Sequence, residues 1–123
     1  MPAAAVIYVG DLERMHAFYQ RCFRLTAADG ADGYRRLASE AWLLTLVQSA
    51  DASPATTPPV RRTNIPIKLA FEVADIETLR PVVAGLGGRV NPVGTEWEFR
   101  SAMHCDCIDP EGNVIQLIQS HDD

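Results

Sequence analysis

The fold is decided by a short segment that occurs twice in the chain, as Val9-Gly10-Asp11-Leu12-Glu13 and as Val73-Ala74-Asp75-Ile76-Glu77. Each copy ends an apolar run, and the two aspartates lie 64 residues apart. An aspartate placed after a strand can cap a helix, because its carboxylate accepts the free backbone N–H groups of the first helical turn. The repeat therefore predicts two halves with one plan, in which a strand is followed by a capped helix and further strands.

The first half begins with a run rich in β-branched residues, from Ala4 to Val9, which predicts a strand. A helix is expected from Leu12 onward, with one apolar, buried face. The residues of that face fall at helical spacing and are Met15, Phe18, Tyr19, Cys22 and Phe23. The Gly- and Asp-rich stretch 28–33 predicts a turn, and strands are expected at 34–38 and 42–48. This half therefore has the order βαβββ, with one later strand poorly marked.

Residues 51–64 contain three prolines and two basic residues without a structural period, which predicts a linker. In the second half we expect a strand at 67–73 and a helix at 76–86. Pro81 predicts a kink, or a helix that begins properly only at Pro81. Strands are then expected at 89–92, 97–108 and 114–119, the last two joined by a turn in which Asp109 and Asn113 bond the local backbone. The halves thus cover about 3–50 and 65–120.

Composition predicts one domain over residues 1–123, because 47% of the chain is hydrophobic and 22% is charged. It has no apolar run of about 18 residues and no basic region at its start, so we expect a cytoplasmic protein that does not bind membranes. Three cysteines, an odd number, predict reduced thiols. The net charge of −5 argues against nucleic acid as a partner and favours a neutral or cationic ligand.

Three features together resemble the vicinal-oxygen-chelate (VOC) superfamily, which includes glyoxalase I, bleomycin resistance proteins and extradiol dioxygenases. They are Val9-x-Asp11-Leu12, a helix with Phe18-Tyr19, and the turn Asp109-Pro110-Glu111-Gly112-Asn113 before Gln116-Leu117. The resemblance covers nearly the whole chain. It implies an α+β fold of two βαβββ modules, whose curled mixed sheets form a cupped pocket. Members of the family usually form homodimers, so the resemblance also implies a homodimer in which a second copy of the chain completes the pocket.

The resemblance also implies where a divalent metal would bind. The family's ligands stand seven residues before each capping aspartate, on a later strand of the first half, and seven residues after the turn aspartate. These positions hold Ala4, Lys68, Thr45 and Gln116. A methyl group has no lone pair, and an ammonium repels a cation, so we predict no metal cofactor. The alternative is a divalent ion (Mn, Fe, Ni or Zn) held by an unusual set such as His104, Asp106 and Gln116.

A polar row in the strand expected at 97–108 gives further candidates. In the family, the positions three and five before the turn aspartate line the cavity, which marks Asp106 and His104. Strand alternation adds Arg100 and Glu98 to that face. The opposite face would pack under the helices with Trp97, Phe99, Met103, Cys105 and Cys107. The alternative for the polar row is a solvated sheet face, and the alternative for Cys105 and Cys107 is a metal pair.

Individual roles follow from these positions. Lys68, facing Gln116, is either an anchor for an anionic ligand group or half of an ion pair with Glu72 or Asp106. Tyr8 shares a strand face with Ala4 and could stack on a ligand. The candidate ligand-binding residues are Lys68, Gln116, Arg100, His104, Tyr8 and Thr45. The candidate catalytic residues are His104, Asp106 and Lys68.

Two functional classes fit these observations. The first is a metal-free binding protein similar to the bleomycin resistance proteins, whose dimer clefts hold a hydrophobic or cationic small molecule without altering it. The alternative is a lyase, isomerase or oxygenase of the glyoxalase or dioxygenase type, with an unusual metal set or working without metal through Lys68 and His104. The sequence favours the binding protein, and metal content discriminates between the two classes.

Overall fold

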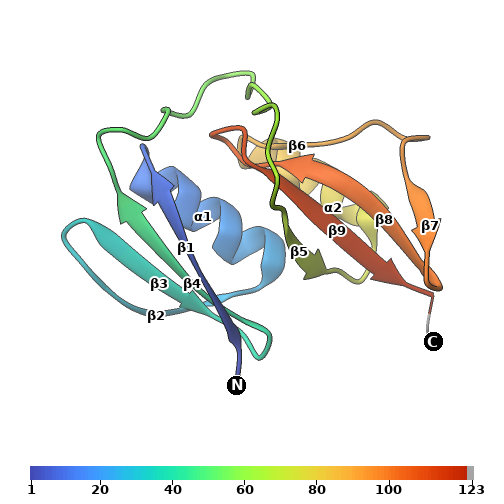
Figure 1. The fold of residues 1–123 in the computed structure, drawn as a ribbon, viewed down its shortest axis with the longest axis horizontal. Coiled ribbons are helices and arrows are strands. Elements are labelled where there is room, and N and C mark those ends of the chain that lie inside the picture. The colour runs from blue at the N-terminus through green and yellow to red at the C-terminus, as the bar shows by residue number, and fades with distance from the viewer. Residues whose placement is uncertain (122–123) are drawn as a thin grey trace.

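The computed structural model describes residues 1–121, which form two mixed β-sheets and two helices (Figure 1). The first half consists of β1 (Ala3–Val9), α1 (Leu12–Phe23), β2 (Thr26–Ala31), β3 (Tyr34–Ala38) and β4 (Trp42–Gln48). The second half consists of β5 (Leu69–Glu72), α2 (Ile76–Gly85), β6 (Arg89–Val90), β7 (Trp97–Phe99), β8 (Ala102–Ile108) and β9 (Val114–Ser120). The predicted α+β class is confirmed.

Each sheet joins its first strand to its last by a parallel pairing, β1 with β4 and β5 with β9. The strand orders are β1-β4-β3-β2 and β5-β9-β8-β6, with β7 paired to β8 outside that path. The other pairings are antiparallel. Figure 1 shows the two sheets side by side, with α1 between them and the segment from β4 to β5 arching over one end.

The two repeated aspartates cap the helices as the repeat predicts. Oδ1 of Asp11 accepts the backbone N–H of Arg14 at 3.2 Å, and Oδ2 of Asp75 accepts that of Thr78 at 3.0 Å. Because of this cap, α2 begins at Ile76 and contains Pro81 in its interior. A helix that starts only at Pro81 is therefore wrong.

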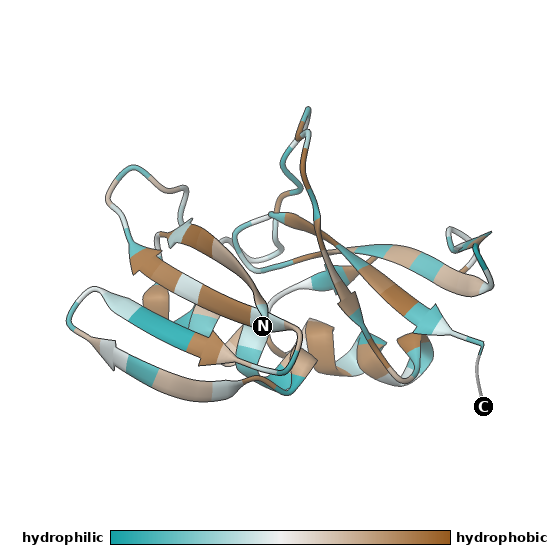
Figure 2. Ribbon diagram, turned by 60° about the horizontal axis from the view of Figure 1, so that its bottom comes forward, coloured by the Kyte–Doolittle hydropathy of each residue, from teal (hydrophilic) through white to brown (hydrophobic). Residues whose placement is uncertain are grey.

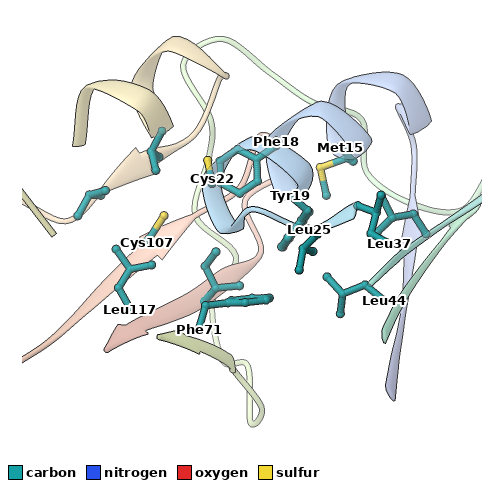
Figure 3. Packing of buried hydrophobic residues seen from close by; sticks show 14 of the residues in the cluster. Met15, Phe18, Tyr19, Cys22, Leu25, Leu37, Leu44, Phe71, Cys107 and Leu117 are labelled. Carbon is teal, nitrogen blue, oxygen red and sulfur yellow. The ribbon is translucent and has the colours of Figure 1, made fainter. Parts of the chain in front are cut away.

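One apolar core joins both sheets through α1 (Figure 3). The predicted buried face is confirmed, since Met15, Phe18 and Tyr19 are fully buried. Phe23 is partly buried and stacks on Phe71 of β5, with ring centroids 4.1 Å apart. Figure 3 shows α1 between side chains of the first sheet and of the second, and the labelled neighbours are Leu37, Leu44, Phe71, Cys107 and Leu117. Because α1 contacts both sheets, it fixes one half of the chain against the other.

The turn between β8 and β9 makes a second connection between the halves. Oδ1 of Asp109 accepts the backbone N–H groups of Glu111 and Asn113, so the role predicted for Asp109 is confirmed. The side chain of Asn113 donates instead to Oδ2 of Asp109, so its predicted bond to the backbone is wrong. Glu111 is 4% exposed, and its Oε2 accepts the N–H groups of Gly10 at 2.9 Å and Asp11 at 2.7 Å. A buried carboxylate from the second half therefore satisfies free donors at the start of α1.

Gly112 lets the segment between the sheets approach this turn closely. Its φ is +85°, and a Cβ atom at this position would lie 1.8 Å from the carbonyl oxygen of Val60. Only glycine, which has no Cβ atom, lets the two backbone segments come this close. The backbone N–H of Arg62 also donates to the carbonyl of Gly112 at 2.9 Å. This contact holds the linker, and with it Arg61 and Arg62, against the second half.

The strand expected at 97–108 is wrong, because the chain reverses within it. Arg100 and Ser101 have φ values of 50° and 63°, and they form the two-residue turn of a hairpin between β7 and β8. Trp97 is therefore paired with His104, and Phe99 with Ala102. Directly paired residues share a sheet face. Trp97 and Phe99 thus lie on the face of His104, and not on the face that packs under the helices.

Three further details differ from the expected elements. Glu98 is paired with Met103, so it leaves the predicted polar row. β2 forms inside the expected turn 28–33, because pairing with β3 extends the strand to Ala31 and leaves only Asp32 and Gly33 to reverse the chain. β6 is limited to two residues.

Hydrophilic and hydrophobic residues are mixed along the strands (Figure 2). On β1, Val6 and Tyr8 are 58% and 64% exposed, whereas Val9 is fully buried. Each sheet thus has one face toward the helices and one open face. Within residues 1–121, neither helix is long and apolar enough to cross a membrane.

Candidate functional site

The hairpin of β7 and β8 gathers three rings on the open face of the second sheet. The indole of Trp97 stacks on the imidazole of His104, with centroids 5.5 Å apart and planes at 19°. Phe99 meets the same imidazole edge-on at 5.7 Å. His104 is 7% exposed, whereas Trp97 is 39% and Phe99 is 55% exposed. His104 therefore supports an aromatic surface on which a flat ligand could stack.

Both ring nitrogens of His104 are bound within the protein. Nδ1 lies 2.9 Å from Oε1 of Gln116, and Nε2 lies 3.3 Å from the carbonyl oxygen of Phe99. A general base needs a lone pair aimed at the substrate. Because both nitrogens of His104 lie within hydrogen-bond distance of groups of the chain, neither is free to take a proton from a ligand in this arrangement.

The carboxylate of Asp106 lies between two cations. Nζ of Lys68 is 3.1 and 2.9 Å from its two oxygens, and Nη2 of Arg61 is 3.3 Å from Oδ2. Among the alternatives predicted for Lys68, the structure forms the ion pair with Asp106. Only 10% of the Asp106 side chain is exposed, against 35% for Lys68 and 40% for Arg61. Two cations against one carboxylate leave one net positive charge at this end of the site.

Arg61 is a site residue that no pattern in the sequence indicates. Its guanidinium also lies 3.4 Å from Oδ1 of Asn91. The sequence does show that Arg61 and Arg62 are the only charged residues between Asp51 and Lys68. Because the linker has no structural period, its sequence does not show which face of which sheet these two side chains approach.

The residues at the family's metal position do not fit a divalent ion. Ala4 offers a methyl group, and the ammonium of Lys68 is paired with Asp106. The alternative set fails as well, because His104 and Gln116 bind each other and Asp106 already carries two cations. A divalent ion needs several free lone pairs to replace its hydration shell. Within residues 1–121, no group of three or more His, Cys, Asp or Glu side chains is arranged to hold a metal.

Two predicted ligand-binding residues lie away from the cluster formed by Lys68, Asp106, His104 and Gln116. Tyr8 and Thr45 belong to β1 and β4 of the first sheet. Arg100 lies in the hairpin turn, with its guanidinium carbon 5.9 Å from the ring centroid of Phe99. The structure brings together Lys68, Asp106, His104 and Gln116.

Cys105 and Cys107 face the core, so the packing interpretation is confirmed. Both are free thiols with no exposed surface. Burial raises the pKa of both thiols. A thiolate is the form that binds metal or attacks a substrate, and burial disfavours that form. These thiols therefore stabilise the core and take no part in the site.

Known proteins of one family resemble this chain in sequence and in structure. Residues 4–118 match the model of the glyoxalase-like domain. A solved glyoxalase/bleomycin resistance protein/dioxygenase family enzyme from Burkholderia phytofirmans PsJN has a TM-score of 0.71 at 18% identity, covering 94% of this chain and 95% of that chain. A glyoxalase/bleomycin resistance protein from Albidiferax ferrireducens T118 has a TM-score of 0.67 at 18% identity, with coverage of 95% and 96%.

The fosfomycin resistance protein FosX from Listeria monocytogenes also shares the fold, with a TM-score of 0.71 at 14% identity and coverage of 98% and 90%. At such identities the likeness shows the fold alone, since one fold hosts many activities. No curated protein matches the chain. Because the family model matches nearly the whole chain and the fold agrees, the chain belongs to the glyoxalase-like family of the VOC superfamily.

Proposed function

We propose that this protein binds a flat, largely apolar small molecule on the open face of β7, β8 and β9, and that it does so without a metal. The observation that carries this proposal is the ion pair of Lys68 with Asp106, 2.9 Å apart, at the family's metal position. An ammonium here supplies the positive charge that a metal would otherwise supply. The exposed rings of Trp97 and Phe99 lie on the same sheet face and offer the apolar surface.

The charges around the site refine the ligand class. The net charge of −5 over the whole chain favours a neutral or cationic ligand. Next to the site, however, Lys68 and Arg61 outweigh Asp106 by one positive charge. Nearby charges outweigh those more than about 10 Å away, because salt screens the distant ones. We therefore expect a neutral ligand, or one whose polar end is acidic.

The enzymatic alternative gains no support from the contacts of His104. This residue would first have to break its bonds to Gln116 and Phe99 before it could accept a proton. Two neighbours, from Listeria monocytogenes and Mesorhizobium loti, are fosfomycin resistance proteins, and a mutant of the first was crystallised with Mn(II). Lys68 at the metal position argues against the same use of Mn(II) by this chain.

We extend the proposal to a homodimer that completes the site. Val6 and Tyr8 on the first sheet are more than half exposed, as is Phe99 on the second. Apolar side chains exposed in this way are typical of interfaces, and twofold pairing is the commonest arrangement. A first sheet facing the partner's second sheet would bring Tyr8 and Thr45 to the site. Light scattering should then give twice the chain mass of 13.5 kDa, and a monomer would contradict this extension.

Ligand titrations with a set of variants test the proposal. Three flat probes of one shape, 2-naphthoate, 2-naphthamide and 2-naphthamidine, differ in charge only. We expect the acid and the amide to bind more tightly than the cation. Trp97→Ala should weaken binding by about tenfold or more, because the stacking surface is lost. Lys68→Gln should weaken binding of the acid more than that of the amide.

Val93→Ala is the control, because Val93 is 73% exposed on the loop between β6 and β7 and lies outside the cluster. This variant should bind the probes like the unaltered protein. Thermal unfolding of each variant checks that the fold is intact. If Trp97→Ala bound all three probes normally, or if no probe bound to the unaltered protein, the proposed site would be wrong.

A further inference from the structure

A separate hollow lies beside β1 and is lined in part by Arg62 of the linker. Its volume is about 620 Å³, and it is lined by Val6, Tyr8, Ser49 and Ser53 together with Arg62. All of these residues come from one chain. None belongs to the cluster on the second sheet, so the hollow does not depend on the binding site proposed there. The homodimer proposed above would cover Val6 and Tyr8, so a ligand in this hollow and that dimer exclude each other.

Arg62 differs from Arg61 in its partners. Arg61 pairs with Asp106, whereas the guanidinium of Arg62 forms no ion pair or hydrogen bond within residues 1–121. Its Nε is buried and unbonded. Buried donors in proteins nearly always have a partner, because desolvation without one is unfavourable. The guanidinium of Arg62 is thus a cation with unused donors.

Two carboxylates lie near Arg62, but neither bonds its guanidinium within residues 1–121. Glu111 lines a neighbouring hollow with Arg62, but both of its oxygens accept backbone N–H groups of Gly10 and Asp11. Asp51 lines the hollow of Arg62, is exposed, and forms no ion pair with it in the described part of the chain. The backbone bond from Arg62 to Gly112 keeps the arginine in this place.

We propose that Arg62 binds the oxyanion of a small aromatic acid, a carboxylate or a phosphate, whose ring lies on Val6 and Tyr8. A guanidinium presents its N–H donors as a planar fork, which fits two oxygens of either group. Tyr8 is 64% exposed and offers a flat apolar surface next to it. The hydroxyl groups of Ser49 and Ser53 line the same hollow and can donate further hydrogen bonds.

Titration of ¹⁵N-labelled protein followed by NMR tests this site directly. The probes are benzoate, phenyl phosphate and, as the neutral probe of the same shape, benzamide. Benzoate or phenyl phosphate should shift the Nε–H signal of Arg62 and the amide signals of Ser49 and Ser53, with a dissociation constant on the order of 1 mM. Benzamide should bind at least about tenfold more weakly. A preference between the two anions would identify the group that the site takes.

Two variants separate the two parts of the proposed contact. Arg62→Gln should weaken benzoate binding by at least about tenfold, since the charge-assisted bonds are lost. Tyr8→Ala, at an exposed strand position, should weaken it several-fold without loss of the fold. Arg89→Gln is the control, because Arg89 is an exposed arginine of β6 outside the hollow. This variant should give the titration curve of the unaltered protein.

The outcomes distinguish this site from the cluster on the second sheet. Shifts at Ser49, Ser53 and Arg62 that disappear in Arg62→Gln would support the inference, even if the naphthyl probes fail to bind. Shifts confined to His104 and Gln116 would overturn it while leaving the first proposal intact. Absence of any shift with both anions, or binding that Arg62→Gln does not change, would also overturn it.

Discussion

The hydroxyl of Tyr19 donates a 2.7 Å hydrogen bond to Oδ2 of Asp109, although the two residues are 90 positions apart in the sequence. Neither residue has any exposed surface. Burial raises the pKa of Asp109, against the lowering effect of hydrogen bonds from Tyr19 and Asn113. Burial, followed by the charge of Asp109, also raises the pKa of Tyr19 well above its ordinary value. The bond fixes α1 of the first half to the β8–β9 turn of the second.

Replacement of Tyr19 by phenylalanine removes this hydroxyl and keeps the ring. Within residues 1–121, Oδ2 of Asp109 then retains only the bond from Nδ2 of Asn113. We expect the free energy of unfolding to fall by about 1–3 kcal/mol, because a buried carboxyl oxygen loses a partner. Urea denaturation measures the change. Tyr34→Phe is the control, with an expected change within about 0.5 kcal/mol. Equal losses in the two variants would mean that the bond to Asp109 contributes nothing specific.

The helix starts could be predicted because capping depends on residues close in sequence. Asp11 and Asp75 each bond an N–H group three residues further on, so a short repeated segment contains all the groups involved. The role of Glu111 at the start of α1 could not be predicted in this way. Its oxygens reach Gly10 and Asp11 from about 100 residues away, and no local pattern carries that information.

The reversal at Arg100 and Ser101 was missed because neither residue is typical of such a turn. Two-residue hairpins require positive φ and usually contain glycine or asparagine. The alternation of polar and apolar residues also continues across the turn, as it would in one long strand. Counting along that alternation assigns Trp97 to the face opposite His104, whereas the hairpin places the two rings in contact.

Ser101→Gly tests the strain that this turn imposes. Ser101 has a φ of 63°, a conformation that costs a residue with a Cβ atom roughly 1 kcal/mol. Glycine adopts it freely but loses more entropy on folding. We expect a net gain of about 0.5 kcal/mol in the free energy of unfolding, measured by urea denaturation. Ser53 is exposed and does not have a positive φ, so the change Ser53→Gly relieves no strain and should not raise the free energy of unfolding. A loss at Ser101 as large as that at Ser53 would exclude strain in this turn.

The three cysteines should be almost unreactive in the folded protein. Burial raises the pKa of Cys22 to about 12, and it also raises the pKa of Cys105 and Cys107. At pH 8 the thiolate form of Cys22 is therefore about one part in ten thousand, and its labelling rate should rise about tenfold for each pH unit while the fold persists. Labelling with a disulfide reagent should report three thiols in concentrated denaturant. Fast labelling of the native protein at pH 8 would contradict the burial of these thiols.

Lys68→His tests whether the charge at one position excludes a metal. In the unaltered protein the ammonium of Lys68 lies 2.9 Å from Asp106 and would repel a divalent ion. We expect the purified protein to hold less than about a tenth of an equivalent of Mn, Fe, Ni or Zn per chain. A neutral imidazole at position 68 supplies a lone pair and releases Asp106 from one of its cations. The affinity for Zn²⁺ should therefore rise by at least about tenfold.

Lys68→Gln separates the two effects, because it removes the charge without adding an imidazole. Its affinity for Zn²⁺ should lie between those of the unaltered protein and Lys68→His. Elemental analysis after dialysis gives the metal content, and calorimetry gives the affinities. If all three proteins bound Zn²⁺ equally, the ion would bind away from Asp106, and the charge of Lys68 would be irrelevant to it. Lys68 and Ala4 supply no lone pairs for a metal ion. A full equivalent of metal in the unaltered protein would therefore mean that other groups hold the ion, and it would refute metal-free binding.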